Sequence, residues 1–91
     1  MKAKISVQSA GNAKYRVTIE QGGDKTTYEV GVSPLERAKY GGKATVERLV
    51  EASFEFLLER EPKESILRSF NLSDIEHYFP EYPKQIRRLL E

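Results

Sequence analysis

The chain has 91 residues, with 15 Lys and Arg against 14 Asp and Glu, and it contains no cysteine. This length fits a single domain with one hydrophobic core. The lack of cysteine excludes disulfides, thiolate metal sites and cysteine nucleophiles, and the net charge of +1 is low for a dedicated nucleic-acid-binding domain.

The first third of the chain alternates apolar and polar residues, which is the pattern of β-strands. The apolar positions are Ile5, Val7, Tyr15, Val17, Ile19, Tyr28, Val30 and Val32. Turn-forming residues at 9–12 and 21–24 separate three short strands. We therefore predict a three-stranded antiparallel β-meander over residues 1–32, with one apolar face that must be covered.

From Ser33 onward the apolar residues recur at helical spacing, and helix start signals are present. Ser33 and Glu36 form a capping box, which predicts a short helix that ends near residues 41–42. Thr45 caps the main helix, whose apolar pattern continues until residues 61–62, Glu-Pro, stop it.

Three shorter helices are predicted after the main one. The first covers residues 63–70 and is closed by Asn71, which tolerates the left-handed conformation. A second capping box at residues 73–76 opens a helix that Pro80 ends. The last helix runs from about residue 83 to residue 90 and is amphipathic.

The predicted fold class is α+β, in a single domain of residues 1–91. The β-meander is followed, over residues 33–91, by one long and several short α-helices packed on one face of the sheet. The N-terminal residues alternate where a signal peptide would be continuously apolar, and no segment reaches transmembrane length. We therefore expect a cytoplasmic protein that does not enter the membrane.

Two motifs stand in the C-terminal half: EREPKESILRSFNL at residues 59–72 and YFPEY at residues 78–82. Together they resemble a family of small bacterial proteins of about this length that has no known function. The resemblance implies a stand-alone bacterial protein and carries over no functional residue.

The polar face of the predicted sheet gathers all the basic residues of the first third. It carries Lys2, Lys4, Lys14, Arg16 and Lys25, against Glu20 and Glu29. Such a face could lie against a nucleic-acid backbone. Single-stranded RNA platforms, however, use exposed aromatic residues, and Tyr15 and Tyr28 fall in the apolar register. Because lysine also protects exposed sheets from aggregation, we favour a solvated face.

The last helix carries a second basic group, made of Lys84, Arg87 and Arg88. These residues could contact a nucleic-acid backbone, but basic residues in a last helical turn also complement the helix dipole. The main helix carries the opposite charge on one side, at Glu47, Glu51, Glu55 and Glu59. We interpret this glutamate ridge as a solvated face, with a basic partner as the alternative.

Phe56 widens the apolar arc of the main helix to roughly 200°, more than one sheet needs. We favour the C-terminal helices as the cover for this surplus, with a second chain as the alternative. Aromatic residues also join the last two helices. If exposed, Tyr78, Phe79 and Tyr82 would form a partner contact together with Phe56, although packing of the helix junction into the core is the interpretation that we favour.

Gly41, Gly42 and Lys43 stand just before the main helix, where backbone amides could hold an anion. The segment lacks the spacing of a nucleotide-binding P-loop, so we favour a helix end followed by a new helix cap. His77 is the one histidine in the chain and has no cysteine or second histidine to work with. We therefore predict no catalytic residue, no cofactor and no metal site.

The function that these patterns favour is a non-catalytic protein-interaction module, which binds an unknown protein partner or forms a homodimer. The alternative is a weak, sequence-nonspecific nucleic-acid-binding protein that uses the basic polar face of the sheet.

Overall fold

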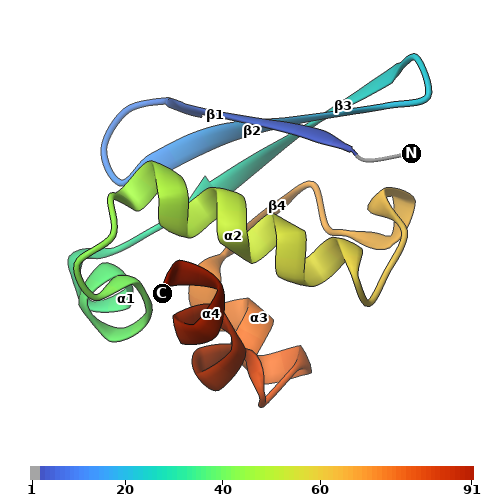
Figure 1. Ribbon diagram of the computed structural model, residues 1–91. Helices are drawn as coiled ribbons and strands as arrows, with labels where there is room; N and C mark the ends of the chain where they lie inside the picture. Colours follow the sequence, from blue (N-terminus) through green and yellow to red (C-terminus); the bar gives the residue numbers. More distant parts are fainter. Residues whose placement is uncertain (1–2) are drawn as a thin grey trace.

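The computed structural model describes residues 3–91 and shows a four-stranded mixed sheet with helices on one of its faces (Figure 1). The strands lie in the order β1-β2-β3-β4. Their bounds are Lys4–Ser9, Lys14–Gln21, Asp24–Gly31 and Ser69–Asn71. The first three strands are antiparallel, and β4 pairs in parallel with β3. The α+β class is confirmed, but the predicted three-stranded sheet lacked this fourth, parallel strand.

The hairpin between β2 and β3 is closed by two glycines in the left-handed region. Gly22 has φ of 60° and Gly23 has φ of 88°, the conformation that a two-residue turn between antiparallel strands demands. The alternation of side chains then places Val17, Tyr28 and Val30 on one buried face. The meander was therefore predictable from alternation and turn residues alone.

The first two helices begin at the predicted caps, Ser33 and Thr45. The bounds of the helices are Pro34–Glu36 for α1, Val46–Leu58 for α2, Leu72–Tyr78 for α3 and Tyr82–Leu90 for α4. A π-helical turn at residues 37–41 continues α1, and a 3-10 turn spans residues 63–65. The Thr45 side chain caps α2, which has 13 residues and ends before residues 61–62. This is an ordinary helix length, so the prediction of one long helix is not confirmed.

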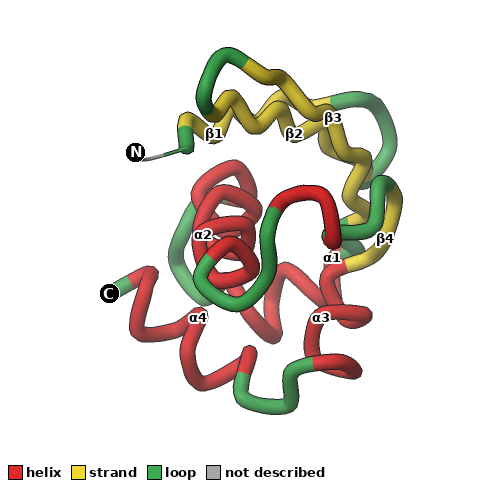
Figure 2. Tube along the Cα trace, turned by 90° about the vertical axis from the view of Figure 1, so that its right-hand side faces the viewer, coloured by secondary structure: helices red, strands yellow, loops and turns green. Residues whose placement is uncertain are grey.

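The elements form three layers, with α2 between the sheet and the pair α3 and α4 (Figure 2). Phe54 faces the sheet, where its ring lies 5.2 Å from that of Tyr28. Phe56 faces the other way, and its ring lies 5.3 Å from that of Tyr82 in α4. Residues two apart on a helix point in nearly opposite directions, so α2 needs cover on both sides. The C-terminal helices provide the second cover, as predicted.

The predicted helix over residues 63–70 is wrong: residues 63–65 form a single 3-10 turn, and the chain then runs without a helix into β4. The free edge of β3 offers backbone groups that need partners, and the N–H of Glu29 donates to the carbonyl of Arg68 at 2.7 Å. Phe70 then lies opposite Val30 in the sheet and is buried. A short apolar run fits a strand as well as a helix, so periodicity could not decide between them.

The predicted roles of Asn71 and of the capping box at residues 73–76 are also wrong. Because β4 arrives extended, Asn71 begins α3 as its N-cap, with φ of −105°, and closes no helix. The Asp74 carboxylate accepts a hydrogen bond from the N–H of Asn71 at 2.9 Å. The N–H of Ser73 donates instead to Glu36, at 2.8 Å. Both errors follow from the missed strand.

We predict that Phe56→Ala lowers the free energy of unfolding by about 3–5 kcal/mol, because it opens a cavity between α2 and the C-terminal helices. Leu35→Ala is the control, since Leu35 is 83% exposed and should change stability by less than about 0.5 kcal/mol. Urea denaturation followed by circular dichroism measures both. A Phe56→Ala variant as stable as the control would contradict the three-layer packing.

Candidate functional site

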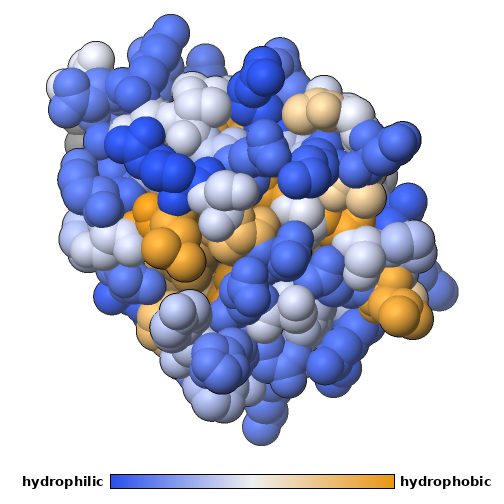
Figure 3. Space-filling view, turned by 180° about the vertical axis from the view of Figure 1, so that it is seen from behind, coloured by the Kyte–Doolittle hydropathy of each residue, from blue (hydrophilic) through white to orange (hydrophobic). Residues whose placement is uncertain are grey.

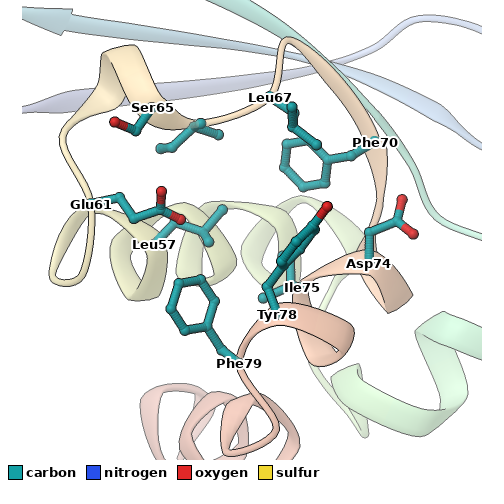
Figure 4. A pocket seen from close by; sticks show the side chains of 10 residues that line it. Leu57, Glu61, Ser65, Leu67, Phe70, Asp74, Ile75, Tyr78 and Phe79 are labelled. Atoms are coloured by element: carbon teal, nitrogen blue, oxygen red, sulfur yellow. The ribbon is translucent and has the colours of Figure 1, made fainter.

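An apolar groove of about 250 Å³ lies between the segment of residues 61–70 and α3 (Figure 4). Leu57 from α2, Phe70 from β4 and Ile75 from α3 form its apolar lining, and Phe79 lies at the end of α3. The groove therefore combines side chains from α2, β4 and α3.

The rim of the groove carries two large, exposed apolar side chains. Ile66 is buried, and the next residue in this non-helical stretch, Leu67, points outward and is 56% exposed. In α3, Ile75 and Tyr78 are one helical turn apart, and Tyr78 is 66% exposed while Ile75 is buried. Seen from behind, the molecule shows apolar side chains gathered within a largely hydrophilic surface (Figure 3).

The charged residues that line the groove are both acidic. Asp74 is held at the start of α3, where its carboxylate accepts the hydrogen bond from Asn71. Glu61 follows α2 and directs its carboxylate into the groove (Figure 4). No lysine or arginine is among the described lining residues. The groove thus has an apolar interior and an acidic border.

A buried network behind the groove fixes the segment that forms its wall. The Tyr28 hydroxyl donates to the carbonyl of Lys63 at 2.6 Å, and burial raises the pKa of Tyr28. The Lys63 ammonium is buried and donates to the Thr26 hydroxyl at 2.9 Å, while it pairs with Glu64 at 3.1 Å. Sequence reasoning missed Lys63. The one sequence feature that could have indicated its burial is Thr26, a polar residue at an inward-facing position of β3 that needs a hydrogen-bond partner.

Glu36 fixes α3, the other wall, relative to α1. Its two carboxylate oxygens accept hydrogen bonds from the N–H groups of Ser33 and Ser73, both at 2.8 Å. Burial alone would raise the pKa of Glu36, but these hydrogen bonds outweigh it and the pKa is lowered. One carboxylate therefore joins the starts of two helices.

The structure separates the four aromatic residues that were considered as a partner contact, the alternative to packing of the helix junction. Tyr78 and Phe79 line the groove, whereas Phe56 is 1% exposed and Tyr82 is fully buried. Burial raises the pKa of the Tyr82 phenol, whose hydroxyl lies 2.7 Å from that of Ser53. Phe56 and Tyr82 therefore support the groove from inside the core and do not reach a partner.

Four of the basic sheet residues share the exposed outer face of the sheet: Lys4, Lys14, Arg16 and Lys25. Acidic residues are interspersed among them. Glu20 of β2 lies opposite Lys4 of β1 on one side and Lys25 of β3 on the other. The Glu29 carboxylate pairs with the Lys14 ammonium at 3.2 Å. The described part of this face carries no aromatic side chain. Lys2 lies outside the described residues.

The second basic group lies far from the first. Lys84, Arg87 and Arg88 are exposed on α4, which packs on the side of α2 that faces away from the sheet (Figures 1 and 2). The two basic groups thus occupy opposite sides of the three layers. One straight nucleic-acid strand could not contact both at once.

The two glycines of the alternative anion site have structural roles, in line with the favoured interpretation as a helix end. A side chain at Gly41 would come within 3.1 Å of Leu49, and Gly42 has φ of 55°, which favours glycine. Lys43 is exposed, and Arg87 from α4 lies at the same shallow depression. Packing and backbone conformation therefore account for the glycine pair without a bound anion.

Arg48 pairs with two of the four glutamates in the ridge of α2. Its guanidinium contacts Glu51 at 2.9 Å and Glu55 at 3.0 Å, and it donates to the carbonyl of Leu89 at 3.3 Å. The middle of the ridge therefore helps to hold α4 on α2. This arrangement supports a structural interpretation of these two glutamates.

His77 is exposed, with its ring 5.5 Å from that of Tyr78. Within residues 3–91, no three His, Cys, Asp or Glu side chains gather where they could hold a metal ion. The helices of this range are all too short or too polar to span a lipid bilayer.

Comparison with family models, with curated proteins and with solved structures gives no match to this chain. The resemblance of its C-terminal motifs to small bacterial proteins therefore stays a prediction. The candidate function rests on the geometry of the chain itself.

We predict that Glu36→Gln destabilises the protein by about 1 kcal/mol near pH 7, because the amide offers one acceptor oxygen for two N–H donors and its NH2 group cannot accept the second. The lowered pKa means that the ionised carboxylate stabilises the fold above the unfolded-state value of about 4.3, and that this contribution is lost as the pH falls through the folded-state pKa. Urea titrations of both proteins from about pH 7 to about pH 3 should show the difference shrinking. A difference independent of pH would contradict this role.

Proposed function

We propose that the protein is a non-catalytic interaction module whose groove binds an apolar segment of a protein partner. The observation that carries this proposal is the exposure of Leu67 and Tyr78 beside an apolar interior. Large exposed aromatic and aliphatic residues around a pocket are where binding energy concentrates in protein interfaces. The proposal accounts for an apolar surface that the fold leaves uncovered.

The size of the groove supports a side-chain anchor over a cofactor. Its 250 Å³ is below the roughly 300–1,000 Å³ of typical small-molecule sites. Full burial of one large apolar side chain contributes about 1.5–3 kcal/mol, so covering two half-exposed ones favours a modest, reversible complex. A transient interface of this kind suits a small adaptor domain.

The charge distribution favours the groove over the alternative nucleic-acid function. Affinity for nucleic acid grows with the number of phosphates that lysine and arginine neutralise. Here the basic residues are divided between opposite sides of the molecule, and Glu20 and Glu29 interrupt the outer sheet face. The groove itself is bordered by Glu61 and Asp74, which would repel phosphates.

A photo-crosslinker in the groove tests the proposal directly. We expect Tyr78→p-benzoylphenylalanine to form a defined covalent adduct with a partner protein in the cells that make it. The same substitution at Leu35 is the matched control, because this side chain is also exposed but does not line the groove. Adding Leu67→Glu should remove the adduct, since docking would desolvate the new carboxylate.

The outcome distinguishes the candidate functions. Adducts that are absent at position 78, or equally frequent at position 35, would contradict the docking groove. An adduct of the chain with itself would identify a homodimer. The basic sheet face would be favoured by two results together. The purified protein would bind single-stranded DNA in a salt-sensitive way, and nuclease treatment of the cell extract would abolish recovery of the partner with the tagged protein.

A further inference from the structure

We propose that the segment bound in the groove carries a lysine or arginine beside its apolar anchor, and that Glu61 pairs with this cation. The inference rests on the proposed docking function and specifies the chemistry of the partner. It starts from the acidic residues around the groove and from the partners that they already have.

The region around the groove is acidic although the whole chain has a net charge of +1. Residues 59–81 contain six Asp and Glu residues against three Lys and Arg residues. Four of the acidic residues have partners within the fold. Glu64 pairs with Lys63, Glu76 with Lys39 and Tyr40, Glu81 with Arg60, and Asp74 with the N–H of Asn71.

The two that remain are Glu59 and Glu61, whose carboxylates make neither a hydrogen bond nor an ion pair within residues 3–91. Glu59 is exposed, but Glu61 is partly buried and lines the groove. The cations next to it in the sequence are engaged. Arg60 lies 3.7 Å above the Phe56 ring, and Lys63 donates to Thr26.

Docking changes the surroundings of Glu61. In the free protein, water solvates the exposed part of this carboxylate. An apolar segment that covers the groove removes this water, and leaving the carboxylate unpaired there is unfavourable. A cation on the segment removes the penalty and adds a charge-assisted hydrogen bond. An acidic segment would be repelled by both Glu61 and Asp74.

Selection from a phage library of short random peptides tests this chemistry without a known partner. The wild-type protein should enrich peptides in which lysine or arginine lies within a few residues of a large apolar residue. Glu61→Lys should reverse this preference toward acidic peptides. Glu59→Lys is the matched control, because it makes the same charge change two residues away and outside the groove.

Affinities of one enriched peptide, measured by fluorescence polarisation, give the size of the effect. We expect Glu61→Lys to weaken binding by about 5- to 10-fold or more, and Glu59→Lys to change it by less than about twofold. High salt should weaken binding to the wild-type protein and narrow the difference between the variants. Thermal unfolding of each variant verifies that it folds.

Two failures are distinguishable. In the first, Leu67→Glu abolishes binding but Glu61→Lys leaves both the selected sequences and the affinity unchanged. This result would support docking in the groove and would contradict the proposal that the bound segment carries a cation. In the second, no enriched peptide depends on Leu67, and the docking function itself fails.

Discussion

The fold depends on the burial of α2 on two opposite sides. A helix that covered the sheet alone would need apolar residues only on the side of Phe54. The presence of Phe56 on the other side requires the chain to return and build a second layer from α3 and α4. The C-terminal third therefore cannot be a detachable tail, because α2 would expose a fully buried aromatic residue without it.

The returning segment is held at separated points, and the groove lies beside it. The Tyr28 hydroxyl binds the carbonyl of Lys63, the N–H of Glu29 binds the carbonyl of Arg68, and Phe70 enters the core. Leu67 stands between these attachments and points outward. Because its neighbours on both sides are fixed, the side chain is presented at a defined place. Preorganisation of this kind reduces the entropy that binding costs.

Local patterns in the sequence predicted the parts of the fold that are local. The meander follows from alternation and a glycine turn, and the starts of α1 and α2 follow from Ser33 and Thr45. The strand β4 depends on the free edge of β3, some forty residues earlier in the chain, and no local pattern encodes that pairing. The burial of Lys63 has the same origin, since its hydrogen-bond partner Thr26 belongs to β3.

The candidate site was predictable only in part, for a related reason. Tyr78 and Phe79 were considered for a partner contact only as the alternative to core packing, and both line the groove. Phe56 and Tyr82 have the same aromatic character but lie in the core, since exposure depends on which layer each helix face meets. Leu67 was missed because the segment around it was assigned to a helix. Its outward direction follows from the non-helical path into β4.

The acidic border of the groove has two physical consequences. An uncovered apolar surface invites nonspecific association, and charges beside it raise the cost of covering it with an arbitrary apolar surface. Glu61 and Asp74 stand at that border. Asp74 is committed to the N-cap of α3, so replacing it would disturb the helix as well as the charge. Glu61 has no such structural duty among the described contacts. It is therefore the residue at which selectivity for a partner can change without loss of the fold.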